Sequence, residues 1–468
     1  MPALTRRLSR LTGQSAPTTR SVAACILTIA AIALGGGGSS APTSELALQL
    51  AAAIVLAAWI LLPPRTPAPT MPPVLWGLIV LALIVPVVQL IPLPPSIWQA
   101  MPGRDVQKAA LTLIGSEHSW RPWSIAPPRT VAALLAIVPP LVALAMVSML
   151  DRSERYWVIA AIAGMALASF ALGALQVSSG PRNIWYLYQY THTGFLVGFH
   201  ANRNAEVDVL LIGLVAWTAI LLPVQRRLGR TRTGAILLAV SAVLVLGCLL
   251  TGSRTGIALV PVAFVFIVSM WWRRQRRHRH LAALAAATAV LVVGVSYLVQ
   301  ANRVLSAIFD RFRLDEDGRI FLWVDTWTAI KRFWPFDSGI GTFRPAFLPG
   351  EQLAVVDDTW PGRAHNEYLE LLLEAGAAGA VVLAAAIALI VWVAIRAARR
   401  KSRPDGAQVL FACAALTIVA IHSIVDYPLR SMALAHLAAV AVGLLVAIAQ
   451  QQGEPETAEK GDSLTSNA

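Results

Sequence analysis

The sequence predicts an all-α polytopic membrane protein with about 12 transmembrane helices and one large extracytoplasmic loop that carries short surface helices. Of its 468 residues, 57% are hydrophobic and only 13% are charged. The apolar residues come in blocks of roughly 16 to 22, close to the length at which a helix crosses a bilayer. This distribution excludes an ordinary soluble domain.

Twelve apolar segments are the candidate spans. They lie at about 21–34, 46–62, 73–94, 131–150, 157–176, 206–223, 235–251, 256–271, 281–300, 377–395, 407–425 and 432–449. The first segment is short and follows basic residues, a pattern that also fits a secretory signal, and we expect it to be a retained helix. The three cysteines, Cys25, Cys248 and Cys413, fall inside spans without metal-type spacing, so neither a disulfide nor zinc is expected.

Arginine clusters predict the orientation of these spans. When twelve spans are threaded in order, the clusters all fall on one side, which the positive-inside rule makes cytoplasmic, together with both termini. The clusters are Arg6, Arg7 and Arg10; Arg152 and Arg155; Arg226, Arg227, Arg230 and Arg232; Arg273, Arg274, Arg276, Arg277 and Arg279; and Arg396, Arg399, Arg400, Lys401 and Arg403. The formal net charge of +13 mostly reflects this bias, so no nucleic-acid partner is expected.

The longest outer segment, residues 301–376, is too long and too patterned to be a simple connector. We expect two or three short helices there, lying on the membrane surface and roofing a cavity. Residues 319–333 form the best candidate, with Trp and Ile on one face and Asp325 and Arg332 pointing away. The apolar face would comprise Ile320, Trp323, Val324, Trp327 and Ile330, followed by Lys331.

Three residues on the outer side form the candidate site. Arg203 precedes the sixth span, Arg254 lies in the hairpin TGSRTG, and His365 ends the long loop. Each alone has a plain explanation, since arginines anchor to lipid phosphate and most histidines at such interfaces are structural. Together they fit one chemistry, in which a pair of guanidinium groups binds a diphosphate and a neutral imidazole accepts a proton from a sugar hydroxyl.

Several other polar residues are weaker candidates. Arg319, Arg363 and Asn366 are candidate substrate contacts. Asp426 and Arg430 are expected to form a structural pair near the cavity rim, and His422 a buried polar contact with no proton relay continuing from it. The acidic run Asp315, Glu316 and Asp317 has no partner at ligand spacing, so we expect a solvated loop and no metal or other cofactor.

Four motifs resemble the O-antigen ligase and polymerase superfamily of bacterial envelope glycosyltransferases. They are AHNEYLELLLEAG at 364–376, LTGSRTG at 250–256, HANRNAE at 200–206, and GRIFLW followed by GIGTF. The resemblance implies a helical fold like that of C-type glycosyltransferases and metal-independent, inverting transfer of a glycan from undecaprenyl diphosphate to an acceptor hydroxyl. By motif match, the essential arginines are Arg203 and Arg254, and the essential histidine is His365. Many relatives carry Asp at the position of Glu367 and Gln at that of Glu370.

The resemblance also suggests a division of the chain and a cellular location. Residues 1–194 would form an N-terminal region of about five transmembrane helices, and residues 195–395 a ligase-like core with the periplasmic loop 301–376. Residues 396–449 would form a C-terminal helix pair, and 450–468 a disordered cytoplasmic tail. The protein would lie in the bacterial inner membrane, in contact with membrane lipids, with its site facing the periplasm.

Three functions remain open at this stage. The first is en bloc transfer to lipid A core by an O-antigen ligase, and the second is the same chemistry with a growing glycan as acceptor, in a polymerase of O-antigen or exopolysaccharide. A protein hydroxyl is a related acceptor. The third, a polysaccharide transporter or flippase, is disfavoured because the chain shows neither duplicated halves nor mid-membrane charges.

Overall fold

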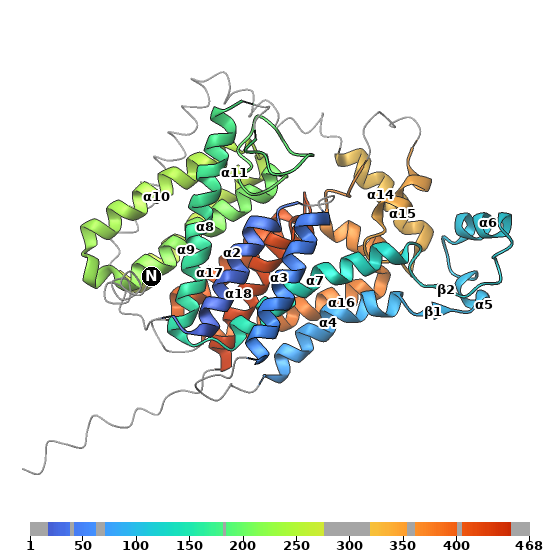
Figure 1. Ribbon diagram of the computed structural model, residues 1–468, viewed down its shortest axis with the longest axis horizontal. Coiled ribbons are helices and arrows are strands. Elements are labelled where there is room, and N and C mark those ends of the chain that lie inside the picture. The colour runs from blue at the N-terminus through green and yellow to red at the C-terminus, as the bar shows by residue number, and fades with distance from the viewer. Residues whose placement is uncertain are drawn as a thin grey trace, which may run out of the picture.

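A computed structural model describes residues 17–37, 42–61, 71–180, 184–275, 319–352, 361–399 and 405–450 (Figure 1). In this part of the chain, nine helices are long and apolar enough to cross a membrane. They are α3 (Pro42–Leu61), α7 (Pro127–Ser148), α8 (Arg152–Ser178), α9 (Arg203–Leu228), α10 (Arg230–Leu250), α11 (Arg254–Gln275), α16 (Glu367–Ala398), α17 (Asp405–His422) and α18 (Met432–Gln450). Two shorter apolar helices are α2 (Thr19–Leu34) and α4 (Pro73–Gln89). The protein is therefore a mostly helical, multi-pass membrane protein.

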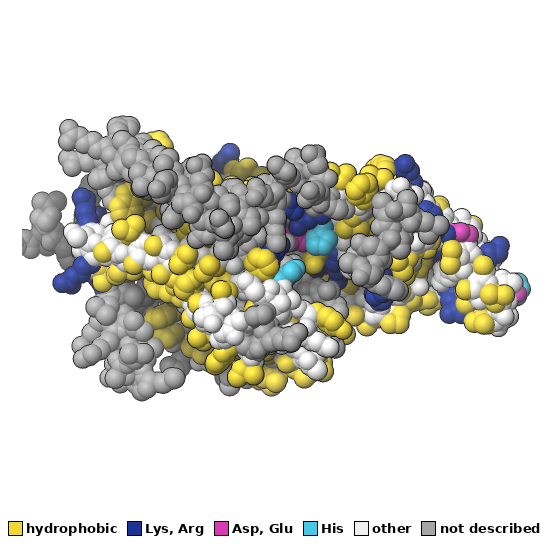
Figure 2. Space-filling view, turned by 90° about the horizontal axis from the view of Figure 1, so that it is seen from above, with side chains coloured by type: hydrophobic (Ala, Val, Ile, Leu, Met, Phe, Trp, Pro, Cys, Tyr) yellow, Lys and Arg dark blue, Asp and Glu magenta, His cyan; other side chains and the backbone are white. Residues whose placement is uncertain are grey.

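Eleven of the twelve predicted segments coincide with these helices. The remaining segment, 281–300, lies outside the residues that the structure describes. The first segment is a helix of 16 residues, short for a bilayer, and the tenth begins within a 32-residue helix that starts ten residues before the predicted span. Hydrophobic side chains cover much of the visible surface (Figure 2), as expected for helices that face lipid.

The helix ends meet at two opposite ends of the bundle. At one end, Arg152 of α8 forms an ion pair with Asp405 of α17, with Nη2 2.8 Å from Oδ2. Arg155 Nε donates to Gln408 Oε1 at 2.8 Å there. These contacts join the starts of α8 and α17, as threading the spans in order predicts.

The other end, which we call the loop end, gathers the polar segments. The amide of Ala433 donates to the carbonyl of Gly35 at 3.1 Å, and the amide of Glu367 to the carbonyl of Ser423 at 2.9 Å. These bonds join the end of α2 to the start of α18, and the start of α16 to the end of α17. The loop end comprises residues 90–126, 184–202, 251–253, 334–352, 361–366 and 423–431.

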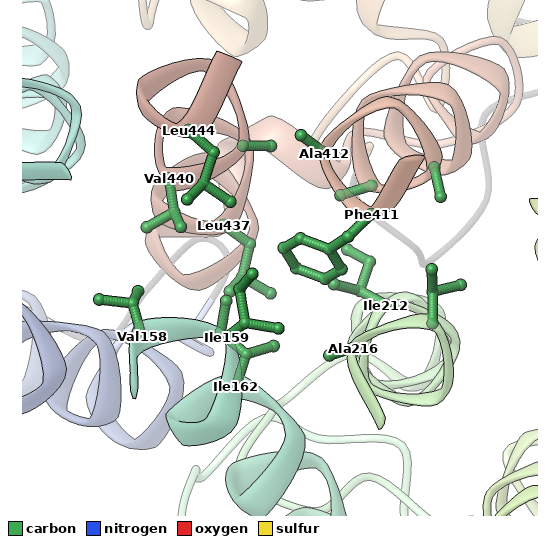
Figure 3. Packing of buried hydrophobic residues seen from close by; sticks show 14 of the residues in the cluster. Val158, Ile159, Ile162, Ile212, Ala216, Phe411, Ala412, Leu437, Val440 and Leu444 are labelled. Atoms are coloured by element: carbon green, nitrogen blue, oxygen red, sulfur yellow. The ribbon is translucent and has the colours of Figure 1, made fainter. Parts of the chain in front are cut away.

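The hydrophobic core lies around α9 and α18, the two most buried of the long helices. Phe411 of α17 packs with Ile212 of α9, Ile159 of α8 and Leu437 of α18 (Figure 3). Each of these four side chains is almost fully buried. Helix α9 also contacts α10 and α11, so its first residue, Arg203, starts one of the two most buried helices of the bundle.

A small subdomain stands at the loop end beside the bundle (Figure 1). It contains β1 (Pro92–Leu93) paired with β2 (Arg121–Pro122), and the short helices α5 (Pro95–Trp98) and α6 (Asp105–Leu113). Arg104 fixes it to the long loop by donating to the backbone carbonyls of Trp123 and Asp337. Burial lowers the pKa of Arg104 to about 10, although the carboxylate of Asp337 opposes the shift.

The helix predicted over residues 319–333 is present as α14 (Arg319–Phe333). Ile320, Val324 and Trp327 are about half exposed, but Ile330 was wrongly assigned to that face, since it is buried. Asp325 does point away from the apolar face, but into the protein, where its Oδ1 accepts from Gln352 Nε2 at 2.6 Å. Two further short elements lie in the part of this loop that the structure describes, α15 (Phe343–Phe347) and the 3₁₀ turn η2 (Leu348–Gly350).

Helix α16 is broken at Gly376, whose φ of 57° and ψ of −155° leave the helical region. A Cβ at this position would lie 2.2 Å from the carbonyl oxygen of Phe336, so only glycine fits. The amide of Ala377 donates to the carbonyl of Pro335 at 3.1 Å. The break coincides with the predicted start of the span at 377. The turns of α16 before Gly376 therefore form a separate short helical segment at the loop end.

Candidate functional site

His365 is held in a fixed position just before α16. Its φ of 49° is unusual for a residue other than glycine, and such conformations persist only where the surroundings impose them. The next residue, Asn366, caps the helix, with Oδ1 accepting from the amides of Tyr368 at 3.1 Å and Leu369 at 3.0 Å. On the other side, Trp323 Nε1 of α14 donates to the His365 carbonyl at 3.3 Å.

A buried carboxylate orients the imidazole of His365. Nδ1 lies 3.2 Å from Oδ1 of Asp426, a residue that is 2% exposed in the turn after α17. The same oxygen accepts from the amide of Tyr427 at 3.0 Å, and Oδ2 accepts from Asn204 Nδ2. Because an ionised carboxylate can only accept, Nδ1 of His365 is the donor, and the lone pair of the neutral ring is on Nε2.

Asp426 stays ionised at physiological pH. Burial alone would raise its pKa, but the hydrogen bond and charge of His365, together with the charges of His422 and Arg319, lower the pKa to about 2. The expected structural pair of Asp426 with Arg430 was wrong, since the two residues have different partners. Arg430 binds Glu374 at 2.6 Å and Glu370 at 3.2 Å, which also raises its pKa.

Arg203 lies against the hairpin that carries Arg254. Its guanidinium sits 4.2 Å above the ring of Phe195. Gly252, with a φ of 61°, lies so close that a Cβ there would be 3.5 Å from Arg203 Nη1 and 2.7 Å from the Phe195 ring. This close approach explains the glycine and brings the two predicted arginines to the same part of the loop end.

Arg254 is half-buried at the first position of α11. The two helices that begin with the predicted arginines touch near their starts, because a Cβ at Gly256 of α11 would lie 2.3 Å from Val207 of α9. Both arginines thus lie beside helix N-termini, whose amide groups and dipoles favour anions. Arg319 likewise begins α14, and its charge acts on Asp426 and Tyr427.

Two of the candidate substrate contacts have structural partners. Arg363 Nη1 donates to Glu370 Oε1 at 2.8 Å, and Glu370 Oε2 accepts from the amide of Ala364 at 3.0 Å. The Arg363–Glu370 pair thus fastens the segment that carries His365 to the first turn of α16. Asn366 uses its carbonyl oxygen as the helix cap, which leaves its amide nitrogen for any other contact.

His192 is a neighbour of the site that sequence reasoning missed. It is exposed in the segment between α8 and α9, and its Nδ1 lies 3.5 Å from the amide nitrogen of Arg203. Neighbouring groups still partly desolvate its ring, and this desolvation, the charge of Arg203 and the proximity of His365 lower its pKa. The segment YTHTGF carries no spacing signal that would have marked this histidine.

Figure 2 shows histidine side chains beside Lys or Arg and Asp or Glu side chains near the middle of one face of the molecule. The imidazole of His365 is 34% exposed. A small pocket adjoins it behind the carboxylate of Asp426, lined by Gly36, Asn202, Asn204, Ala205, His422, Asp426, Tyr427, Pro428 and Ser431. The wall of this pocket therefore includes residues of the first and last parts of the described chain.

The arrangement combines a proton acceptor with a basic, anion-favouring surface. A histidine with a carboxylate on Nδ1 and an accessible Nε2 has the geometry of a general base. Among the described residues, no group of three or more His, Cys, Asp or Glu side chains is arranged to hold a metal ion. The acidic run at Asp315, Glu316 and Asp317 lies outside the described residues.

Comparison with known proteins gives one family. Residues 238–384 match the family model described as O-antigen ligase. The matched segment contains Arg254, Arg319 and His365, whereas Arg203 and Asp426 lie outside it. A search among curated proteins finds no match to the chain. The match confirms the resemblance and includes three of the four sequence motifs, all but HANRNAE at 200–206.

Proposed function

We propose that this protein, whose residues 238–384 match the O-antigen ligase family model, transfers a glycan en bloc from undecaprenyl diphosphate to an acceptor hydroxyl. The observation that carries the proposal is the His365–Asp426 pair, which lies at the same end of the bundle as Arg203 and Arg254. The acceptor of an O-antigen ligase is lipid A core. The reaction takes place at the periplasmic face of the bacterial inner membrane and needs no metal.

His365 acts as the general base in this reaction. Its Nε2 takes the proton of the acceptor hydroxyl while the oxygen forms a bond to the anomeric carbon of the donor glycan. The bond from that carbon to the diphosphate oxygen breaks, and its electron pair leaves with undecaprenyl diphosphate. Direct displacement inverts the anomeric centre. Asp426 stabilises the imidazolium that forms and keeps its Nε2 directed away from the carboxylate.

The arginines stabilise the departing diphosphate. Guanidinium groups bind phosphate oxygens through two parallel hydrogen bonds. The N-termini of α9 and α11 add backbone N–H groups, which also favour a bound anion. An alcohol is a very weak acid, so the base contributes only as the new bond forms, and charge stabilisation on the leaving group supplies most of the rate. Arg319, whose charge acts on Asp426, would contact the same anion.

The direct test uses purified protein with a lipid-linked repeat and either lipid A core or the repeat alone, in buffer with excess EDTA. A ligase gives a glycan ladder on lipid A core, and a polymerase gives a ladder on the repeat itself. We expect transfer to persist in EDTA, because arginines rather than a divalent cation hold the diphosphate. Loss of activity in EDTA that magnesium or manganese restores would contradict the metal-independent mechanism, and absence of transfer to either acceptor would contradict the function.

Replacing Asp426 by asparagine should lower turnover by roughly 10- to 10³-fold, since the neutral amide cannot stabilise the imidazolium. The pKa of Asp426 is depressed to about 2 from an ordinary value of 3.8, so its stabilising effect is complete above about pH 4 and is lost only as pH falls through 2. Over pH 5 to 9 the deficit of Asp426→Asn should therefore persist. The matched control is Asp105→Asn, at an exposed ion pair with Arg332 in the same loop region. Equal activity of the two variants would remove Asp426 from the mechanism.

The proposed sidedness can be tested by cysteine labelling. In a background lacking the three native cysteines, Thr112→Cys in α6 should react with a membrane-impermeant maleimide in intact spheroplasts, whereas Thr231→Cys in α10 should not. Both positions are exposed, at opposite ends of the bundle. Both should react once the membrane is permeabilised. The reverse pattern in intact cells would place the site in the cytoplasm.

A further inference from the structure

We propose that His422 and Asp208 are positioning residues for His365, acting through Asp426. In this arrangement a protonated His422, held by Asp208, places a positive charge beside the carboxylate that orients His365. The inference rests on the proposed function of His365 as a base. The buried polar contact expected for His422 is present, with Asp208 as its partner.

The geometry is a continuous line of alternating imidazoles and carboxylates. His365 Nδ1 lies 3.2 Å from Asp426 Oδ1, and His422 Nε2 lies 4.0 Å from Asp426 Oδ2. On its other side, His422 Nδ1 lies 2.8 Å from Oδ1 of Asp208. The line starts at the open site and ends inside α9.

Both inner residues are fully enclosed. His422 is 1% exposed and Asp208 is 0% exposed, on the neighbouring helices α17 and α9. Within the described part of the chain, His422 Nε2 and Asp208 Oδ2 have no hydrogen-bond partner, and His422 lines the pocket behind Asp426. His422 lies between two carboxylates, those of Asp208 and Asp426. This position favours the protonated form of its imidazole, because a neutral imidazole would offset neither negative charge.

Charge pairing explains why this arrangement is stable. Burying two carboxylates without a cation between them is costly, and one imidazolium between Asp208 and Asp426 offsets that cost. Other charged or titratable groups that face the line in the described part of the chain include Arg319, which acts on His422 and Asp426, and His200, which acts on Asp208. His192 in the segment before α9 also interacts with Asp426 and His365, and it is unchanged in every variant below. Arg319 lies at the start of α14 and His200 just before α9, so neither takes the place of His422 between the two carboxylates.

The charge on His422 has a predictable effect on His365. A positive charge on His422 offsets part of the negative charge of Asp426. Protonation of His365 is therefore less favourable than it would be beside Asp426 without that positive charge. Without it, His365 should hold its proton to higher pH. We expect an upward shift of about half to one pH unit, as for a unit charge acting at an effective dielectric constant of about 20 or more.

The test follows the protonation of His365 directly. Diethyl pyrocarbonate acylates neutral imidazole but not imidazolium, so the rate of His365 modification against pH, measured by mass spectrometry, reports its titration without any glycan substrate. The variants are His422→Gln and Asp208→Asn, and the matched control is His436→Gln, at a buried histidine of α18 whose Nε2 lies 3.1 Å from Thr28 Oγ1. Monodisperse elution in detergent is required of each variant, and Asp208→Asn serves if His422→Gln does not fold.

We expect both site variants to move the half-modification pH of His365 upward, the double variant to move it no further than either single one, and His436→Gln to leave it unchanged. The acid limb of the pH–rate profile for glycan transfer should move in the same direction. An unchanged half-modification pH in His422→Gln or Asp208→Asn, or the same shift in His436→Gln, would overturn the proposal. Failure of the proposed function is separate, since it would show as absent transfer in the wild-type protein.

Discussion

Replacing His365 by alanine is expected to lower the turnover of glycan transfer by about 10²- to 10⁴-fold, the usual contribution of a general base. Binding of the lipid-linked donor should change little, because the imidazole acts on the acceptor hydroxyl. The measurement compares initial rates and donor binding of the variant and wild type at matched membrane insertion. This is the largest effect expected for one side chain, since His365 is the proposed proton acceptor.

A suitable control is His118→Ala, because the side chain of His118 is 90% exposed in the loop-end subdomain, with Glu117 as its ion-pair partner. It should transfer glycan at the wild-type rate. If His365→Ala also transferred glycan at the wild-type rate, His365 would be a structural residue. Its φ of 49° would then be explained by the folding of the loop alone.

Replacing Arg254 by lysine should also be severe, with a loss on the order of 10² in turnover. Lysine keeps the positive charge but lacks the planar fork that binds two phosphate oxygens at once. The same loss is expected for Arg203→Lys, and there the stacking on Phe195 is lost as well. Turnover with saturating lipid-linked donor is the quantity to measure.

The alternative explanation predicts the opposite result. If Arg254 merely anchors to lipid headgroups, lysine reaches lipid phosphate about as well. Arg254→Lys should then transfer glycan at nearly the wild-type rate. Arg129→Lys is the matched control, because Arg129 is an exposed arginine at the loop end of α7. A full rate in Arg254→Lys, together with a full rate in the control, would assign Arg254 to anchoring.

The helices could be predicted from the sequence because lipid leaves few alternatives. An apolar run of sufficient length must satisfy its backbone hydrogen bonds internally, and eleven predicted segments accordingly coincide with helices. The predicted start of the tenth span at 377 lies next to Gly376, but the break in α16 at that glycine was not predicted. The packing of α14 was not predicted either, because the burial of Asp325 depends on Gln352, a partner 27 residues away.

The candidate site could be predicted only in part. Arg203, Arg254 and His365 stood out because polar residues on the outer side of apolar spans need an explanation. The partner of His365 did not, because Asp426 is 61 residues away and the nearby Arg430 offered a simpler pairing. Local sequence gives the residue types at a given depth, but which of them touch is decided by how the helices pack.

The roles of Arg363 and Asn366 show the same limit. Both lie next to His365, and sequence proximity alone suggested substrate contacts. In the structure, Arg363 is bound to Glu370 and Asn366 caps α16, so their known contacts maintain the conformation of the segment. Hydrogen-bond partners within one turn of a helix can be anticipated from capping rules, whereas the ion pair required knowledge of the loop path.

The position of Asp426 after α17 has a consequence for biogenesis. The chain is synthesised from its N-terminus, so the segments that carry Arg203, Arg254 and His365 emerge from the ribosome before the hairpin of α17 and α18. A nascent protein would thus contain its arginines and histidine while the carboxylate was still untranslated. The proposed His365–Asp426 pair can therefore form only after the segment between the final two helices has been synthesised.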